Sequence, residues 1–139
     1  MDEYRLKHSI SVGRKMMEIG KLYNLSDKEL EELFLLGYNH DIGYEFSNNG
    51  DNHNIIGGKI LKQNGYKYWQ EVYYHGEVDT LYKSKYLDIL NQADMQIDKY
   101  GNDVGYDARL EDIKSRYGVD SIPYKKSKQI VDLIRKGKR

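Results

Sequence analysis

Apolar residues recur along most of the chain three or four positions apart, and glycines stand between many of these periodic segments. Such spacing gathers the apolar side chains of a segment on one face of an α-helix, where they can pack against a core. Pro123 is the only proline, so there is little in the chain to break a helix. The pattern therefore predicts an all-α protein, a compact single-domain bundle of about six to seven helices.

The predicted helices have recognisable starts and ends. Ser26 and Glu29 are spaced as a capping box, so the second helix has the clearest start. The stretch "GYEFSNNGDN" is predicted to be a polar loop, with Asn52 or Asp51 as the cap of the third helix. The helices are expected over about residues 4–19, 26–41, 53–64, 66–75, 83–98, 107–117 and 124–136.

Composition and charge exclude several classes of protein. The chain has 22 basic and 22 acidic residues, so its net charge gives no reason to expect nucleic acid or an anionic membrane as partner. It has no cysteine, which excludes a disulfide scaffold, a thiolate zinc site and a cysteine nucleophile. No apolar run approaches the roughly 18 to 20 residues that span a bilayer, and the start "MDEYRLKHSI" is acidic where a signal peptide is basic. We expect a cytoplasmic protein with one domain over residues 1–139 and a basic C-terminal helix and tail over about 124–139.

Histidines and aspartates fall on the predicted apolar faces. His40 follows Leu33 by seven positions and Asp41 follows Phe34 by seven, which places each pair within about 20° on a helix. An ionised carboxylate in a core needs a cation, a cluster of donors or a metal ion beside it. The same inward placement is predicted for every other histidine of the chain and for a further aspartate: His8, His53, His75 and Asp94.

A shared metal site explains these six residues better than six separate core polar groups. A single His–Asp pair would more often be a hydrogen-bonded core pair. Six separately buried polar groups, however, would each lower a free energy of unfolding that is only about 5 to 15 kcal/mol for a whole domain. Imidazole and carboxylate without thiolate suit manganese, iron, cobalt, nickel or zinc rather than a calcium cage. Six ligands exceed the need of one ion and suit two, with Asp41 as the natural bridge. The sequence leaves the metal, and whether one or two ions bind, open.

The ordered set resembles the metal-binding pattern of the HD-domain superfamily of metal-dependent phosphohydrolases, in its small single-domain bacterial form. The segments that carry the resemblance are "HDIGY", "HNIIGGKILKQNGY", "YYHGE" and "LNQADMQID". The resemblance implies an all-α fold and cleavage of a phosphoester or phosphoanhydride by a metal-activated water, with a nucleotide or related small molecule as substrate. It implies that His40 and Asp41 are catalytic. It also implies a ligand set shared with mononuclear members (His8, His40, Asp41 and Asp94) and an additional pair found in dinuclear members (His53 and His75).

One position departs from the pattern of that superfamily. Several dinuclear relatives have a lysine where this chain has Tyr44, and a phenol can donate a hydrogen bond but cannot neutralise a phosphate. A positive charge must then come from Lys99, Arg109 or elsewhere, so these three residues are the substrate-binding candidates. Tyr44 could equally pack at the mouth of the loop. Asp98 and Glu77 could orient a water or a ligand histidine, although solvated surface carboxylates are the simpler interpretation.

Two other functions stay open. A catalytically weak HD module could bind metal or nucleotide and regulate a partner, and Tyr44 in place of lysine favours this reading. Nucleic-acid binding would rest on the basic end "YKKSKQIVDLIRKGKR", which is more simply a solvated helix face. The sequence leaves open whether the fourteen tyrosines cover a homodimer interface or only the surface.

Overall fold

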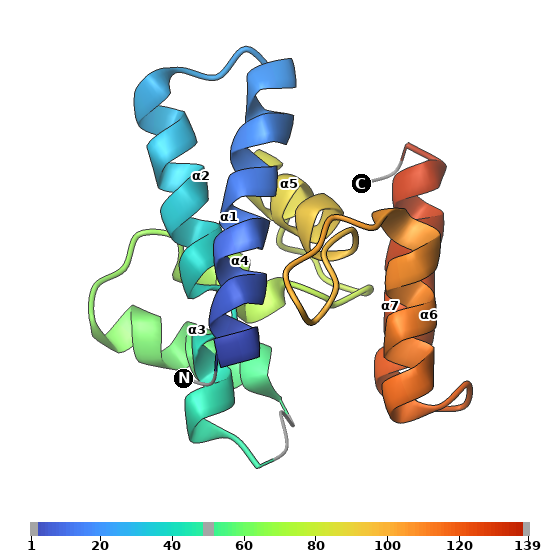
Figure 1. Cartoon of the computed structure of the whole chain (residues 1–139). Coiled ribbons are helices and arrows are strands. Elements are labelled where there is room, and N and C mark those ends of the chain that lie inside the picture. Colours follow the sequence, from blue (N-terminus) through green and yellow to red (C-terminus); the bar gives the residue numbers. More distant parts are fainter. Residues whose placement is uncertain (1–2, 49–51, 138–139) are drawn as a thin grey trace.

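The computed structural model describes residues 3–48 and 52–137, and Figure 1 shows the helices along the chain. Seven α-helices, one short 3₁₀-helix and no strand are found in these two ranges, which confirms the predicted all-α bundle. Asp51, one of the two expected caps of the third helix, lies outside the described residues. The elements are α1 (Glu3–Leu22), α2 (Asp27–Asn39), η1 (Ile42–Phe46), α3 (His53–Gln63), α4 (Trp69–Tyr74), α5 (Lys85–Asp94), α6 (Gly105–Tyr117) and α7 (Ile122–Arg135).

Helices α1 and α2 lie side by side with their backbones in direct contact. A Cβ atom on Gly37 would lie 2.5 Å from the Cα atom of Gly13, so neither position has room for a side chain. The predicted capping box at the start of α2 is confirmed: the Ser26 side chain accepts from the Glu29 amide, and the Glu29 carboxylate accepts from the Ser26 amide. The close approach brings the first half of α1 beside the C-terminal end of α2.

Some predicted boundaries were wrong, and two of them lie where a tertiary contact replaces the local pattern. The predicted polar loop after α2 contains η1, in which Gly43 packs against the backbone of His53. The fourth helix begins at Trp69 rather than at residue 66. The fifth ends at Asp94 rather than at residue 98, because Ile97 pairs with Asp103 in an antiparallel bridge and the chain turns back.

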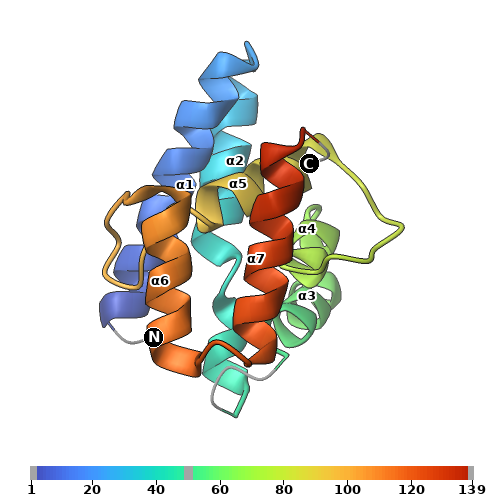
Figure 2. The same cartoon turned by 90° about the vertical axis from the view of Figure 1, so that its right-hand side faces the viewer.

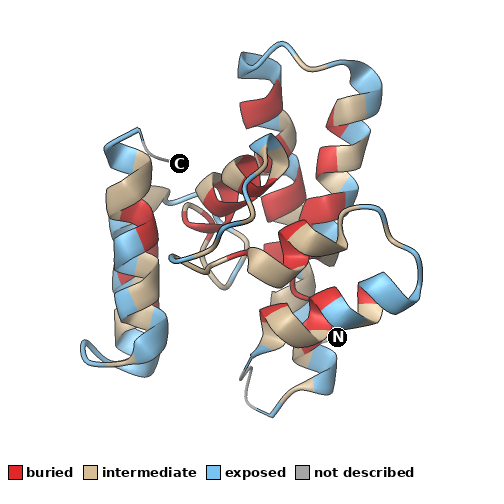
Figure 3. Ribbon diagram, turned by 180° about the vertical axis from the view of Figure 1, so that it is seen from behind, coloured by how far each residue is buried: buried red, intermediate tan, exposed pale blue. Residues whose placement is uncertain are grey.

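The larger core cluster lies among helices α1 to α5. Its fully buried members include Val12, Met16, Leu33, Leu36 and Leu90. Burial of such a side chain contributes about 1.5 to 3 kcal/mol, so this cluster holds the helices that carry the candidate site. In Figure 3 the buried residues concentrate on the facing sides of these helices. No helix in the described ranges is long and apolar enough to cross a membrane.

Helices α6 and α7 form a hairpin that lies beside the rest of the molecule (Figures 1 and 2). A second, smaller apolar cluster fixes the hairpin to the end of α5, with Met95, Leu110, Ile113, Ile130 and Val131 as its buried members. The Ser121 side chain caps α7 by accepting from the Tyr124 amide, and Pro123 stands in the first turn, where its missing N–H costs nothing.

Candidate metal centre

All six histidine and aspartate residues singled out in the sequence meet in one place, and most of them stand at helix ends. His8 belongs to α1, and His53 and Asp94 are the first residue of α3 and the last of α5. His40 and His75 cap the C-termini of α2 and α4, and Asp41 follows His40. Five of the six are buried, and the side chain of His53 is 24% exposed. Their donor atoms lie within 4.8 Å of one another in three overlapping groups: His8, His40 and Asp41; His40, His75 and Asp94; and Asp41, His53 and His75.

Asp41 stands at the centre of the cluster, between two pairs of histidines. Its Oδ2 atom lies 3.6 Å from Nε2 of His8 and 3.3 Å from Nε2 of His40. Its Oδ1 atom lies 3.4 Å from Nε2 of His53 and 3.5 Å from Nε2 of His75. Each carboxylate oxygen therefore faces a different pair of imidazoles, which is the arrangement that a bridging carboxylate requires.

Backbone carbonyl groups set the ring orientation of three histidines. Nδ1 of His40 donates to the carbonyl of Gly37, and Nδ1 of His75 donates to that of Val72, both at 2.6 Å. Each acceptor lies three residues back, in the last turn of a helix, where it also accepts from the backbone amide of the same histidine at 3.4 Å. A carbonyl can only accept, so Nδ1 carries the hydrogen and Nε2 is left to face the carboxylates.

His8 is oriented in the same way, but from a distant part of the chain. Its Nδ1 donates to the carbonyl of Asp98 at 2.9 Å, and its Nε2 lies 2.9 Å from Oδ1 of Asp94. The Asp98 carboxylate does not point at the cluster: it accepts from the amides of Tyr100 and Asn102 and so closes the turn that presents its carbonyl. The Asp98 carboxylate therefore contacts no ligand histidine, as the simpler interpretation expected, and it is the backbone carbonyl of Asp98 whose role the sequence did not predict.

Glu77, the other carboxylate considered near the site, also has protein partners. It accepts from the side-chain amide of Asn54 at 3.0 Å and pairs with Lys126 of α7 at 3.0 Å. This residue joins α3 and α7 rather than orienting a ligand histidine.

The buried charges shift one another's pKa values strongly. Burial by itself would lower the pKa of His40, but Asp41 and Asp94 outweigh it and raise that pKa well above its ordinary value. Burial would raise the pKa of each aspartate, but the neighbouring imidazoles hold both well below the usual carboxyl range. Without a metal ion, a proton on His40 therefore supplies positive charge between two carboxylates. A metal ion would take over that charge and release the proton.

The donor set fits a divalent transition metal. Nε2 of His40 and Nε2 of His75 are buried and face oxygens of Asp41 at 3.3 Å and 3.5 Å, without the alignment of a full hydrogen bond. Imidazole nitrogens and carboxylate oxygens turned toward a common centre are the ligands that manganese, iron, cobalt, nickel and zinc accept.

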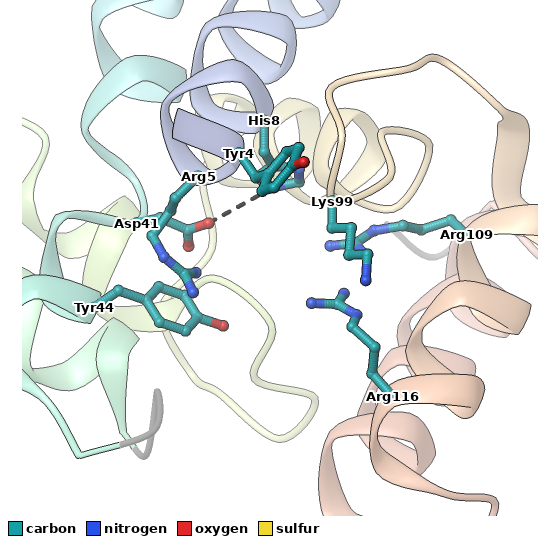
Figure 4. A pocket seen from close by; sticks show the side chains of 8 residues that line it. All are labelled: Tyr4, Arg5, His8, Asp41, Tyr44, Lys99, Arg109 and Arg116. Carbon is teal, nitrogen blue, oxygen red and sulfur yellow. Dashed lines mark ion pairs between the residues drawn. The ribbon is translucent and has the colours of Figure 1, made fainter. Parts of the chain in front are cut away.

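A pocket of about 240 Å³ opens beside the cluster (Figure 4). His8 and Asp41 form its inner end, and the rest of the lining is aromatic or basic: Tyr4, Arg5, Tyr44, Lys99, Arg109 and Arg116. All three substrate-binding candidates from the sequence thus line this pocket. Its single acidic lining residue, Asp41, belongs to the ligand cluster, so the pocket suits an anionic ligand.

Tyr44 is stacked between an arginine and a ligand candidate. Its ring lies 4.1 Å from that of His53, centroid to centroid, and the guanidinium carbon of Arg5 lies 3.4 Å from its own centroid. Burial, and next the charge of Asp41, raise the pKa of Tyr44, so its phenol stays protonated and able to donate. A cation therefore stands directly beside the position that lacks the expected lysine.

Arg109 and Lys99 have different surroundings. Arg109 is buried: its Nε donates to the backbone carbonyl of Asp94 at 3.1 Å, and its Nη1 pairs with Asp112 at 2.9 Å. It therefore braces the helix end that carries Asp94. The ammonium of Lys99 lies 4.9 Å from the centroid of the Tyr100 ring, near the protein surface.

Sequence reasoning missed three lining residues: Tyr4, Arg5 and Arg116. Two of these residues could have been found from their spacing along a helix. Arg5 precedes His8 by three positions and Arg116 follows Arg109 by seven, so each shares a helix face with a residue already selected. Two basic side chains of the C-terminal helix have acidic partners: Lys126 pairs with Glu77, and Arg135 with an aspartate of α6.

One known protein family matches most of this chain. The family model described as HD domain matches residues 5–132, a range that includes all six residues of the cluster and most of the hairpin. Neither the curated proteins nor the solved structures include a match.

Proposed function

The chain belongs to the HD-domain family, and from this premise we propose that it is a metal-dependent phosphohydrolase that cleaves a phosphoester or phosphoanhydride of a nucleotide or related small molecule. The observation that carries the proposal is the position of Asp41. Its two oxygens face two pairs of histidines, and it borders a pocket with basic walls. Ligands for metal and a binding surface for an anion thus stand side by side.

The proposed ligand set comes from the cluster alone. His8, His40, Asp41 and Asp94 would hold one ion, and His53 and His75 would hold a second, bridged by Asp41. Iron, manganese, cobalt, nickel and zinc are all compatible with these donors. When bound, such ions would supply Lewis acidity and would lower the pKa of a water to about 7.

The protein's own residues have three tasks in this proposal. The carbonyl groups of Gly37 and Val72 keep the Nε2 atoms of their histidines turned inward, so no reorganisation is needed when substrate arrives. His40 and Asp41 form the catalytic core of the site. Tyr44 donates a hydrogen bond to a phosphoryl oxygen, while Arg5 beside it supplies the charge that a phenol lacks.

An aromatic residue at the pocket supports a nucleotide as substrate. Tyr4 lines the pocket, is 54% exposed and stands edge-on to Tyr100 at a centroid distance of 5.1 Å. Exposed rings of this kind offer a stacking surface for a nucleobase, worth about 1 to 3 kcal/mol where measured in other proteins.

The test combines elemental analysis with hydrolysis. Protein purified without added metal is analysed for transition metals and assayed against a panel of nucleotides for phosphate release. We expect bound metal and metal-dependent turnover, and we expect Asp41→Ala to lose both by more than about 100-fold, since even partners outside the first ligand layer cost 10- to 100-fold. Asp120→Ala, an exposed change in the turn before α7, is the matched control and should retain both. Undiminished metal content and turnover in Asp41→Ala would refute the proposal.

The alternative is a catalytically weak module that binds metal or nucleotide and regulates a partner. Tyr44, where several dinuclear relatives have lysine, favours it. The same nucleotide panel separates the two functions when thermal stabilisation is recorded beside phosphate release. Stabilisation by a nucleotide without turnover, in protein with full metal content, would support the regulatory module.

A further inference from the structure

Three cationic side chains gather on one wall of the pocket, across from Asp41 and Tyr44. Lys99 comes from the loop between α5 and α6, and Arg109 and Arg116 come from α6. Figure 4 shows their nitrogen atoms turned toward the same opening. A chain whose basic and acidic residues are equal in number thus concentrates positive charge beside its candidate metal ligands.

This wall has more positive charge than its protein partners neutralise. Arg109 and Arg116 share one carboxylate, Asp112, at 2.9 Å and 3.3 Å. Lys99 makes no ion pair with another described residue, and its ammonium lies against the ring of Tyr100. Like charges on one wall repel each other, and an anion bound between them would relieve that repulsion.

Only Arg109 of the three is tied to the ligand cluster, through Asp94. Within the part of the chain that the structure describes, neither Lys99 nor Arg116 pairs with any of the six ligand candidates. Among the described residues, Lys99 and Arg116 together therefore have only the one carboxylate of Asp112, which Arg109 shares, and the excess positive charge can be matched by an anion in the pocket. The pocket, at about 240 Å³, is smaller than the roughly 300 to 1,000 Å³ of pockets that enclose a drug-sized molecule. It suits the phosphate end of a substrate, with the remainder outside near Tyr4.

We propose that Lys99 and Arg116 form a second anion subsite, which binds the phosphate group next to the one that is hydrolysed. This inference rests on the proposed function and narrows its substrates to compounds with at least two neighbouring phosphate groups. A guanidinium group can hold two oxygens of one phosphate at once, and a lysine adds a point charge beside it. Arg109, anchored to Asp94, stands between this subsite and the metal ligands.

The test compares two probes that differ by one anionic group and that the enzyme cannot hydrolyse. Methylphosphonate and methylenediphosphonate are titrated calorimetrically into metal-loaded protein, with the same divalent ion in excess so that the diphosphonate does not strip the site. We expect the diphosphonate to bind at least about tenfold more tightly, as one added charge-assisted contact implies. Arg116→Gln should remove most of this advantage and leave methylphosphonate binding unchanged, and Lys99→Gln should remove part of it.

Lys114→Gln is the matched control, because it makes a comparable charge change two residues from Arg116, at a position outside the pocket lining. It should keep the full advantage. Equal affinities for the two probes would overturn the subsite, as would an advantage that survives in both Arg116→Gln and Lys99→Gln, since the diphosphonate would then be held by metal alone. Binding is measured without turnover, so a failure of the proposed hydrolase activity leaves this result unaffected. Conversely, equal affinities beside intact hydrolysis of a monoester would remove only the subsite.

Discussion

The five helices α1–α5 and the hairpin α6–α7 face the same pocket but bring different chemistry to it. All six ligand candidates belong to the first region, where each is fixed by helix ends, backbone carbonyls or buried packing. The hairpin contributes no member of that cluster and lines the pocket with two arginines instead. The difference is that the candidate metal ligands are fixed in the larger core, whereas two arginines of the pocket stand on a separate element that is held by a smaller apolar cluster.

The attachment of the hairpin supports this division. Besides its small apolar cluster, the hairpin is held by Arg109, which binds the end of α5, and by Lys126, which pairs with Glu77. Lys126 is 44% exposed, so its ion pair contributes little stability. Changes in the larger region should therefore alter metal binding, and changes in the hairpin should alter substrate binding.

The largest effect is expected from a charge change within the cluster. Asp94→Asn should lower metal affinity by more than about 100-fold, because it replaces an anionic ligand by a neutral amide. Asp112→Asn removes the same charge from the hairpin and should change metal affinity less than tenfold. Competition with a chelator measures both. Similar losses in the two variants would show that the hairpin belongs to the metal centre after all.

The next largest effect is expected on the free energy of unfolding, from a change in the packing of η1 against α3. A Cβ atom at Gly43 would lie 1.8 Å from the carbonyl oxygen of His53, so Gly43→Ala must push η1 away from α3. We expect a loss of about 1 to 3 kcal/mol in the free energy of unfolding. Urea denaturation measures it, with Lys114→Ala on the hairpin surface as a control that should stay within about 0.5 kcal/mol of the parent. A Gly43→Ala protein of unchanged stability would contradict the close packing.

A smaller effect should follow from loosening the turn that orients His8. Asp98→Ala removes the carboxylate that accepts from the Tyr100 and Asn102 amides, so the carbonyl offered to His8 is less firmly placed. We expect metal affinity to fall about tenfold, the low end for partners of a ligand histidine. Asp98→Asn keeps an oxygen acceptor and should retain most of the affinity. Equal behaviour of the two variants would mean that the turn does not need this side chain.

The smallest effect concerns the hairpin's ion pair. Lys126→Met should cost about 0.2 to 1 kcal/mol, as expected for a partly exposed pair. Hydrogen exchange should become faster in α7 and stay unchanged in α2. Lys125→Met, at the exposed neighbouring position, is the control. Faster exchange throughout both helices would argue against a separately attached hairpin.

Much of this arrangement could be predicted from sequence, because the signals are local. Apolar periodicity and caps such as Ser26 predict helices whatever surrounds them, and they place His40 and Asp41 on an inward face. Local sequence patterns do not show which distant residue a loop contacts. The pattern around Asp98 did not indicate that its backbone carbonyl orients His8, ninety residues earlier.

The sequence by itself determined the helices, the inward placement of the ligand candidates and the family to which their order belongs. Only the tertiary structure decided that the oxygens of Asp41 face two different pairs of histidines, and that Arg5 and Arg116 line the same pocket as Tyr44. The physical reason is distance along the chain. A helix is stabilised by contacts three or four residues apart, whereas His8 and Asp94 meet across 86 residues, and such a contact exists only once the core has packed.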